Sequence, residues 1–78
     1  MDALNNAKRE CISGLFAERA SLHNACTDGR LLENLHHYGI FTGLCTALRS
    51  MGQEVNVIEV ERGDFVDVVD FSLENVSF

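Results

Sequence analysis

Apolar side chains recur at helical intervals through the first third of the chain. They follow one another at steps of three, four or seven residues, with Lys8, Arg9, Glu18 and most other charges on the opposite side. The stripe consists of Leu4, Ala7, Cys11, Leu15, Leu22 and Cys26, widened by Ile12 and Phe16. This spacing predicts an amphipathic helix over residues 2–26. Gly14 lies inside the pattern, so the sequence leaves open whether the helix is continuous or broken there.

A second helical pattern covers residues 30–51. Its apolar stripe consists of Leu31, Leu35, Tyr38, Phe41 or Thr42, Cys45 and Leu48, extended by Ile40, Leu44, Ala47 and Met51. Gly29 suits the left-handed position that ends the first helix, and Thr27 or Asp28 is a candidate cap for the second. Gly52 is expected to end the second helix. Because the turn is short, we predict an antiparallel αα-hairpin.

Small residues are placed where the two predicted helices would meet. Folding the chain about Asp28 brings Gly14 opposite Thr42, beside Gly39 and Gly43. Small side chains at a helix contact let the backbones approach closely. We therefore interpret these glycines as helix-packing residues.

The period of the pattern changes at residue 54, where β-branched residues begin to alternate with acids. Residues 54–71 read as a β-hairpin with its turn at Arg62-Gly63, followed by a tail over residues 72–78. A pairing centred on that turn places Val60 opposite Phe65, Ile58 opposite Asp67 and Val57 opposite Val68. A loop of another length would change these partners.

Both faces of the predicted hairpin are apolar. One carries Ile58, Val60, Phe65, Val69 and Phe71, and the other carries Val55, Val57, Val66 and Val68. A two-stranded hairpin is marginally stable alone, and the helices can cover only one face. The other face needs the tail or a second chain, and we assign Val55, Val57, Val66 and Val68 to self-association as a homodimer. The predicted fold is α+β: an antiparallel αα-hairpin followed by an acidic β-hairpin, in one domain over residues 1–78.

The excess of negative over positive charge is confined to the last third of the chain. Residues 51–78 hold seven acids and one base, whereas residues 1–50 hold five of each, so the formal net charge of −6 falls in the hairpin region. A field of this sign repels nucleic acid and anionic lipid and attracts basic partners. The predicted partner-facing residues are Glu59, Glu61, Asp64, Asp67 and Asp70. Protection of the strand edges against aggregation is the competing explanation of the same residues.

Candidate catalytic and metal-binding residues are present without a supporting pattern. The chain has three histidines and three cysteines, but no His-x-x-x-His or Cys-x-x-Cys pair. His23 and His36 are the best available grouping, near the turn between the helices. The cysteines lie in apolar stripes, as core residues do. Two pairs of acids, Glu59 with Glu61 and Asp67 with Asp70, could in principle serve acid–base chemistry, but no His, Lys or Gly-rich phosphate loop is placed with them. We therefore expect no metal, no cofactor and no catalytic residue.

Other sequence features narrow the class of protein. No apolar run approaches the length of a membrane span, and the first residues lack the basic and apolar regions of a secretory signal. The three cysteines are odd in number and widely spaced, which favours a reduced, cytoplasmic protein. One basic pair, Lys8-Arg9, and the absence of Trp argue against direct binding of nucleic acid.

The function predicted from these features is that of a small, non-catalytic interaction protein. It would associate with itself and bind the basic surface of another protein through its acidic hairpin. A specific form is an inhibitor that occupies a nucleic-acid-binding surface of its target, as small phage or mobile-element proteins do. The alternatives are a small ligand-binding protein or enzyme with its site at an oligomer interface, around His23 and His36, and a structural subunit of a larger assembly.

Overall fold

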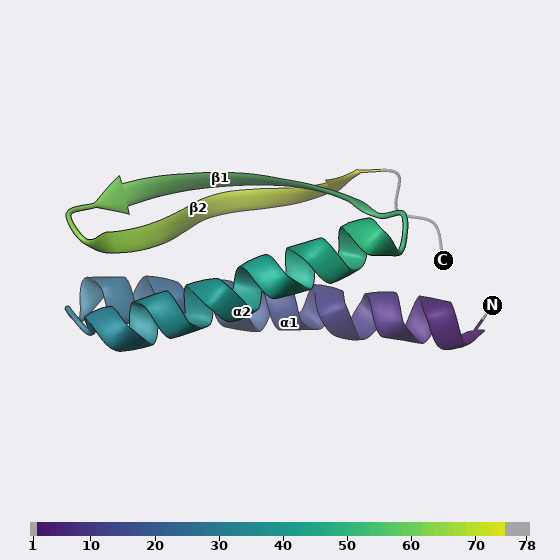
Figure 1. Cartoon of the computed structure of the whole chain (residues 1–78), viewed down its shortest axis with the longest axis horizontal. Coiled ribbons are helices and arrows are strands. Elements are labelled where there is room, and N and C mark those ends of the chain that lie inside the picture. Colours follow the sequence, from purple (N-terminus) through teal and green to yellow (C-terminus); the bar gives the residue numbers. More distant parts are fainter. Residues whose placement is uncertain (1, 75–78) are drawn as a thin grey trace.

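The computed structural model describes residues 2–74 and has two helices followed by two strands. The elements, in chain order, are α1 (Asp2–Thr27), α2 (Leu31–Ser50), β1 (Glu54–Arg62) and β2 (Phe65–Glu74) (Figure 1). The predicted α-α-β-β order and the α+β class are confirmed. Strand β2 continues past residue 71, so residues 72–74 of the predicted tail belong to the hairpin. The rest of that tail, residues 75–78, lies outside the described residues.

Helix α1 is continuous through Gly14, where the two helices come close together. A Cβ atom added to Gly14 would lie 2.8 Å from Cδ1 of Leu44. A side chain at position 14 would therefore require the end of the Leu44 side chain to move. Gly39 and Gly43 are exposed, and a Cβ at either would meet nothing within 4 Å. Their predicted role in helix packing was wrong, because α2 turns Phe41, Cys45 and Leu48 inward instead.

The turn between the helices is built by backbone hydrogen bonds. Gly29 has a φ of +73°, and the Arg30 amide donates to the Ala25 carbonyl at 2.8 Å. Arg30 occupies the N-cap position of α2 without a side-chain capping bond, so the cap predicted at Thr27 or Asp28 was wrong. An acid, Glu33, lies in the first turn of α2, where the helix dipole favours negative charge.

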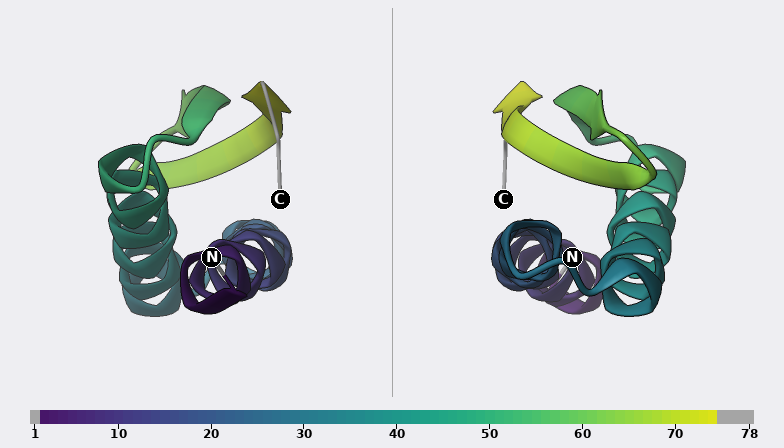
Figure 2. Two further views of the ribbon diagram at one scale, coloured as in Figure 1. Left: turned by 90° about the vertical axis from the view of Figure 1, so that its right-hand side faces the viewer. Right: turned by 90° about the vertical axis from the view of Figure 1, so that its left-hand side faces the viewer.

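The hairpin forms a second layer that lies lengthwise on the helix pair, with its loop at the same end as the turn between the helices (Figures 1 and 2). The core between the layers consists of Leu15, Leu22, Phe41, Cys45, Leu48, Val55 and Val68. The ring of Phe71 on β2 lies 4.8 Å from that of Phe16 on α1 and 5.7 Å from that of Phe41 on α2. Aromatic contacts at these distances add to the stabilisation from apolar burial, so Phe71 fastens the hairpin to both helices.

The register of the hairpin differs from the predicted one for two reasons. The two loop residues are Gly63 and Asp64, because Arg62 pairs with Phe65. Gly63, with a φ of +64°, occupies the first loop position, as glycine often does in two-residue hairpins. A β-bulge then lets Ile58 pair with Asp70 while Glu59 pairs with Val68, which leaves Val69 as the extra residue.

The new register changes which residues lie on the helices. The bulge brings Phe71 opposite Val57 and onto the helix-facing side. Val55 and Val68 are 5% and 1% exposed, and Val57 and Val66 are half-buried. The face assigned to self-association was therefore wrong, because its valines attach the hairpin to the molecule's own helices. On the outer face, Ile58 is 61% exposed.

Candidate functional site

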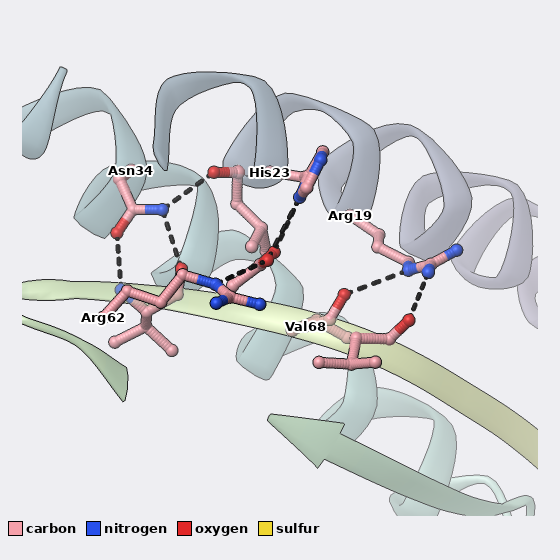
Figure 3. Close-up of polar contacts among 9 residues, drawn as sticks. Arg19, His23, Asn34, Arg62 and Val68 are labelled. Atoms are coloured by element: carbon pink, nitrogen blue, oxygen red, sulfur yellow. Dashed lines mark hydrogen bonds and ion pairs between the residues drawn. The ribbon is translucent and has the colours of Figure 1, made fainter. Parts of the chain in front are cut away.

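Side chains from both helices hydrogen-bond to the backbone of β2 along the edge that does not pair with β1. Asn34 on α2 donates through Nδ2 to the Val66 carbonyl at 2.8 Å, and its Oδ1 accepts from the Val66 amide at 2.9 Å (Figure 3). Arg19 on α1 donates through Nε to the Val68 carbonyl at 3.1 Å and through Nη2 to the Val69 carbonyl. These bonds occupy backbone groups that would otherwise offer a template for another strand.

The free edge of β1 is open over most of its length. In an antiparallel pair, residues opposite each other both direct their backbone groups either inward or outward. The backbone N–H and C=O of Val66 point outward to Asn34, so the backbone groups of its partner Glu61 point away from β2. Those of Glu59 and Val57 do the same, because this orientation repeats at every second residue of β1. Within residues 2–74 these outward groups have no hydrogen-bond partner, whereas the Val55 carbonyl accepts from Arg49 at 2.8 Å.

The side chains beside this open edge are acidic on the helix side. Glu59 and Glu61 are exposed, and the carboxylate of Glu59 accepts a hydrogen bond from the Tyr38 hydroxyl. That bond, together with burial and the negative charges of both glutamates, raises the pKa of Tyr38 to about 12. Tyr38, Val57 and Glu59 line a groove of about 150 Å³ between α2 and β1. Two carboxylates therefore border the edge where the backbone is unpaired, and Arg49 of α2 lines the same groove.

On its other side the same edge is apolar. Ile58 and Val60 alternate with Glu59 and Glu61 along β1 and belong to the outer face of the sheet. Ile58 is exposed and Val60 is half-buried. A strand that paired with β1 would thus meet carboxylates on one of its faces and aliphatic side chains on the other. We refer to the segment from Val57 to Glu61 as the open edge.

Of the five acids predicted to face a partner, four are exposed. Glu59 and Glu61 border the open edge, Asp64 lies in the hairpin loop, and Asp70 accepts a hydrogen bond from the Phe71 amide at 2.9 Å. Asp67, the fifth of these acids, is buried. Its side chain is 4% exposed and points toward α1, so it is not available to a partner.

Asp67 is the centre of an ionic cluster between the hairpin and α1. His23 Nδ1 lies 3.0 and 3.1 Å from its two carboxylate oxygens, and Arg62 Nε donates to Oδ2 at 3.3 Å (Figure 3). Burial alone would raise the pKa of Asp67, but the hydrogen bonds and positive charges of His23 and Arg62 outweigh it and lower the pKa. The cluster therefore favours the ionised carboxylate.

His23 and His36, the best grouping that the sequence offered, contact different partners. His23 pairs with Asp67, whereas the His36 ring packs on that of His37, with centroids 5.4 Å apart. His37 in turn contacts Glu18 on α1, with Nδ1 2.5 Å from Oε2. All three cysteines are free thiols. Among residues 2–74, no three His, Cys, Asp or Glu side chains are placed to hold a metal ion.

Asn34 and Arg19, which bind the edge of β2, were not among the residues predicted from the sequence. A signal existed for Asn34, because it precedes the buried Phe41 and Leu48 at steps of seven and thus lies in the apolar stripe. A polar residue in such a stripe needs buried hydrogen-bond partners. Arg19 had no comparable signal, because a charged residue on the polar side of a helix is ordinary.

Comparison with known protein families, curated proteins and solved structures finds no match to this chain. Of the helices in the described part of the chain, neither has the length and apolar character needed to cross a membrane.

Proposed function

We propose that the protein is a non-catalytic interaction module that binds an extended, basic segment of a partner protein at the open edge. The observation that carries this proposal is the coincidence of unpaired backbone groups with the carboxylates of Glu59 and Glu61. Pairing with an exposed strand is a common mode of peptide recognition, in which main-chain hydrogen bonds give affinity and alternate side chains give specificity. The partner segment would become the third strand of the sheet.

The two sides of the open edge define the chemistry of the partner. Cross-strand neighbours on one face of a sheet interact directly, so opposite charges are favoured beside Glu59 and Glu61. Apolar residues are favoured beside Ile58 and Val60. The segment that fits best therefore alternates Lys or Arg with aliphatic residues. The net charge of −6 would also speed its association, since complementary fields steer the encounter.

A second copy of the chain fits this edge less well. Two β1 strands paired edge to edge would bring like charges of Glu59 and Glu61 together, which is destabilising. Homodimer formation stays a prediction, and it would have to use another surface. The finer proposal, an inhibitor in the cytoplasm that covers the basic nucleic-acid-binding surface of its target, requires the same alternation of basic and apolar residues in that target.

The proposal is tested with a short peptide of alternating lysine and valine, labelled for fluorescence anisotropy. The variant Glu61→Pro removes one outward amide without taking a hydrogen bond from β2, and Glu59→Gln with Glu61→Gln removes the charges. We expect each to weaken binding about tenfold, or about 1.4 kcal/mol. Glu10→Gln, an exposed acid on α1, is the matched control and should bind as the wild type does.

A peptide that alternates glutamate and valine controls for non-specific strand pairing and should not bind. Equal affinity of wild type and Glu61→Pro for the lysine peptide, with both proteins folded by circular dichroism, would overturn the proposal. Loss of binding in Glu10→Gln to the same extent would also overturn it, because the attraction would then depend on net charge alone.

A further inference from the structure

A pocket between α1 and β2 collects positive groups in this acidic protein. Its volume is about 340 Å³, and its polar lining includes Arg19, His23 and Arg62. Its apolar lining includes Phe16, Ala20 and Val69. The pocket lies on the edge of the hairpin opposite the open edge, so it is separate from the surface proposed for a protein partner.

The charges around the pocket do not cancel. Two arginines, Arg19 and Arg62, and one carboxylate, that of Asp67, line the pocket, so its formal charge is positive even with His23 neutral. Asp67 alone needs only one cation to balance it. The excess is unusual in a molecule with a net charge of −6, whose Lys and Arg residues number six. The local potential therefore favours an anion although the protein as a whole repels polyanions.

The positive groups also retain unused hydrogen-bond donors. Arg62 uses Nε for Asp67, which leaves both terminal amino groups without a partner in the described part of the chain. His23 uses Nδ1 for the same carboxylate, which leaves Nε2, and more than half of its side chain is exposed. The buried carboxylate thus orients an arginine fork and an imidazole whose remaining nitrogens are available to a ligand.

We propose that this pocket binds a small organic anion, in which a carboxylate or phosphate group is attached to an apolar, ring-sized body. The oxyanion would accept hydrogen bonds from Arg62 and His23, with further charge from Arg19. The apolar body would lie against Phe16 and Val69, which are 58% and 44% exposed in the structure. A small anion is favoured over nucleic acid because the surrounding acids repel an extended polyanion but are largely screened from a single charge.

The test is a titration of the uniformly ¹⁵N-labelled protein with benzoate and with phenyl phosphate, followed by amide chemical shifts. We expect saturable shifts at Ala20, His23 and Val69 with one or both compounds. The stronger of the two identifies the anionic group. Inorganic phosphate, which lacks the ring, should bind more weakly than phenyl phosphate, and benzyl alcohol, which lacks the charge, should give no saturable shifts. Absence of saturable shifts with both aromatic anions, or equal shifts with benzyl alcohol, overturns the proposal.

Substitutions of residues that line the pocket test whether the anion binds there. Arg62→Gln should weaken binding of the aromatic anion about tenfold, consistent with the loss of a charge-assisted pair. Arg30→Gln is the matched control, because Arg30 is a partly exposed arginine beside the helix turn that pairs with Asp28 and Glu33, and it should bind as the wild type does. Val69→Ser should weaken the aromatic anions but not inorganic phosphate. Equal losses in Arg62→Gln and Arg30→Gln, with both proteins folded, would show general charge attraction and overturn the proposal.

Discussion

The side chain of Asn34 binds the backbone of Val66 through both of its functional groups, with bonds of 2.8 and 2.9 Å. Its Nδ2 also donates to the Leu22 carbonyl at 2.8 Å, so one fully buried amide joins α1, α2 and β2. A buried polar side chain stabilises a fold only when its partners are in place, and here both donor positions and the acceptor are used. Asn34 therefore fixes the position of the hairpin relative to the helices.

Replacing Asn34 should destabilise the protein, because its backbone partners would be buried without a hydrogen bond. In Asn34→Leu the Val66 amide and carbonyl lose their partner, and we expect a loss on the order of 1–3 kcal/mol in the free energy of unfolding, measured with urea. Hydrogen exchange at the Val66 amide should accelerate more than that of the helix amides. Asn24→Leu, at an exposed position of α1, is the control and should change stability little. Unchanged protection of Val66 would contradict the assigned role.

The ionic cluster around Asp67 should make the stability of the protein depend on pH in the acid range. Because the pKa of Asp67 is lowered on folding, its contribution is present above the unfolded value of about 3.9 and is lost as the pH falls through the folded value. Asp67→Asn should reduce stability at neutral pH by an amount on the order of 1–3 kcal/mol. The difference from wild type should shrink below about pH 4.

The control for this prediction is Asp64→Asn, which changes an exposed acid of the hairpin loop. It should leave the urea midpoint nearly unchanged at all pH values, because exposed charges contribute little to stability. A constant difference between wild type and Asp67→Asn down to acid pH would show that ionisation of Asp67 does not contribute to stability.

The sequence predicted the elements well because apolar periodicity reports burial directly. The bounds of both helices agree with the structure to within one residue. The register was wrong because nothing in the alternation of β1 and β2 marks Val69 as an extra residue, and one such residue transfers Phe71 to the other face. Asn34 and Asp67 were missed or misplaced because periodicity treats polar residues as exposed. Their burial depends on partners from distant parts of the chain.

The three cysteines should differ in reactivity. Cys45 is buried and Cys11 and Cys26 are half-buried. Burial raises the pKa of the Cys45 thiol, although Arg49 opposes the shift, so less of the reactive thiolate is present at neutral pH. Alkylation of the native protein with iodoacetamide, followed by mass spectrometry of peptides, should modify Cys45 last. In denaturant the three should react at similar rates, and modification of Cys45 first in the native protein would contradict the packing of α2.

Replacing two glycines inside the helices with alanine should change the stability of the protein by different amounts. Gly43→Ala should raise stability by about 0.5–1 kcal/mol, because alanine is the better helix former and its Cβ meets nothing within 4 Å. Gly14→Ala should gain less or lose stability, because its Cβ would lie 2.8 Å from Leu44, which must move. Thermal unfolding compares the two, and the double variant Gly14→Ala, Leu44→Ala tests the clash. Equal gains at both glycines would show that the helices are farther apart than described.

Lysine substitutions on the two faces of the hairpin test which face lies on the helices. Val68 is 1% exposed, so Val68→Lys buries an unpaired charge and should abolish the cooperative unfolding transition. Ile58 is 61% exposed, so Ile58→Lys should leave the fold intact, as shown by circular dichroism. If the protein forms a dimer through the outer face, sedimentation velocity should show Ile58→Lys as a monomer. A folded Val68→Lys together with an unfolded Ile58→Lys would reverse the assignment of the faces, and with it the position of the open edge relative to α2.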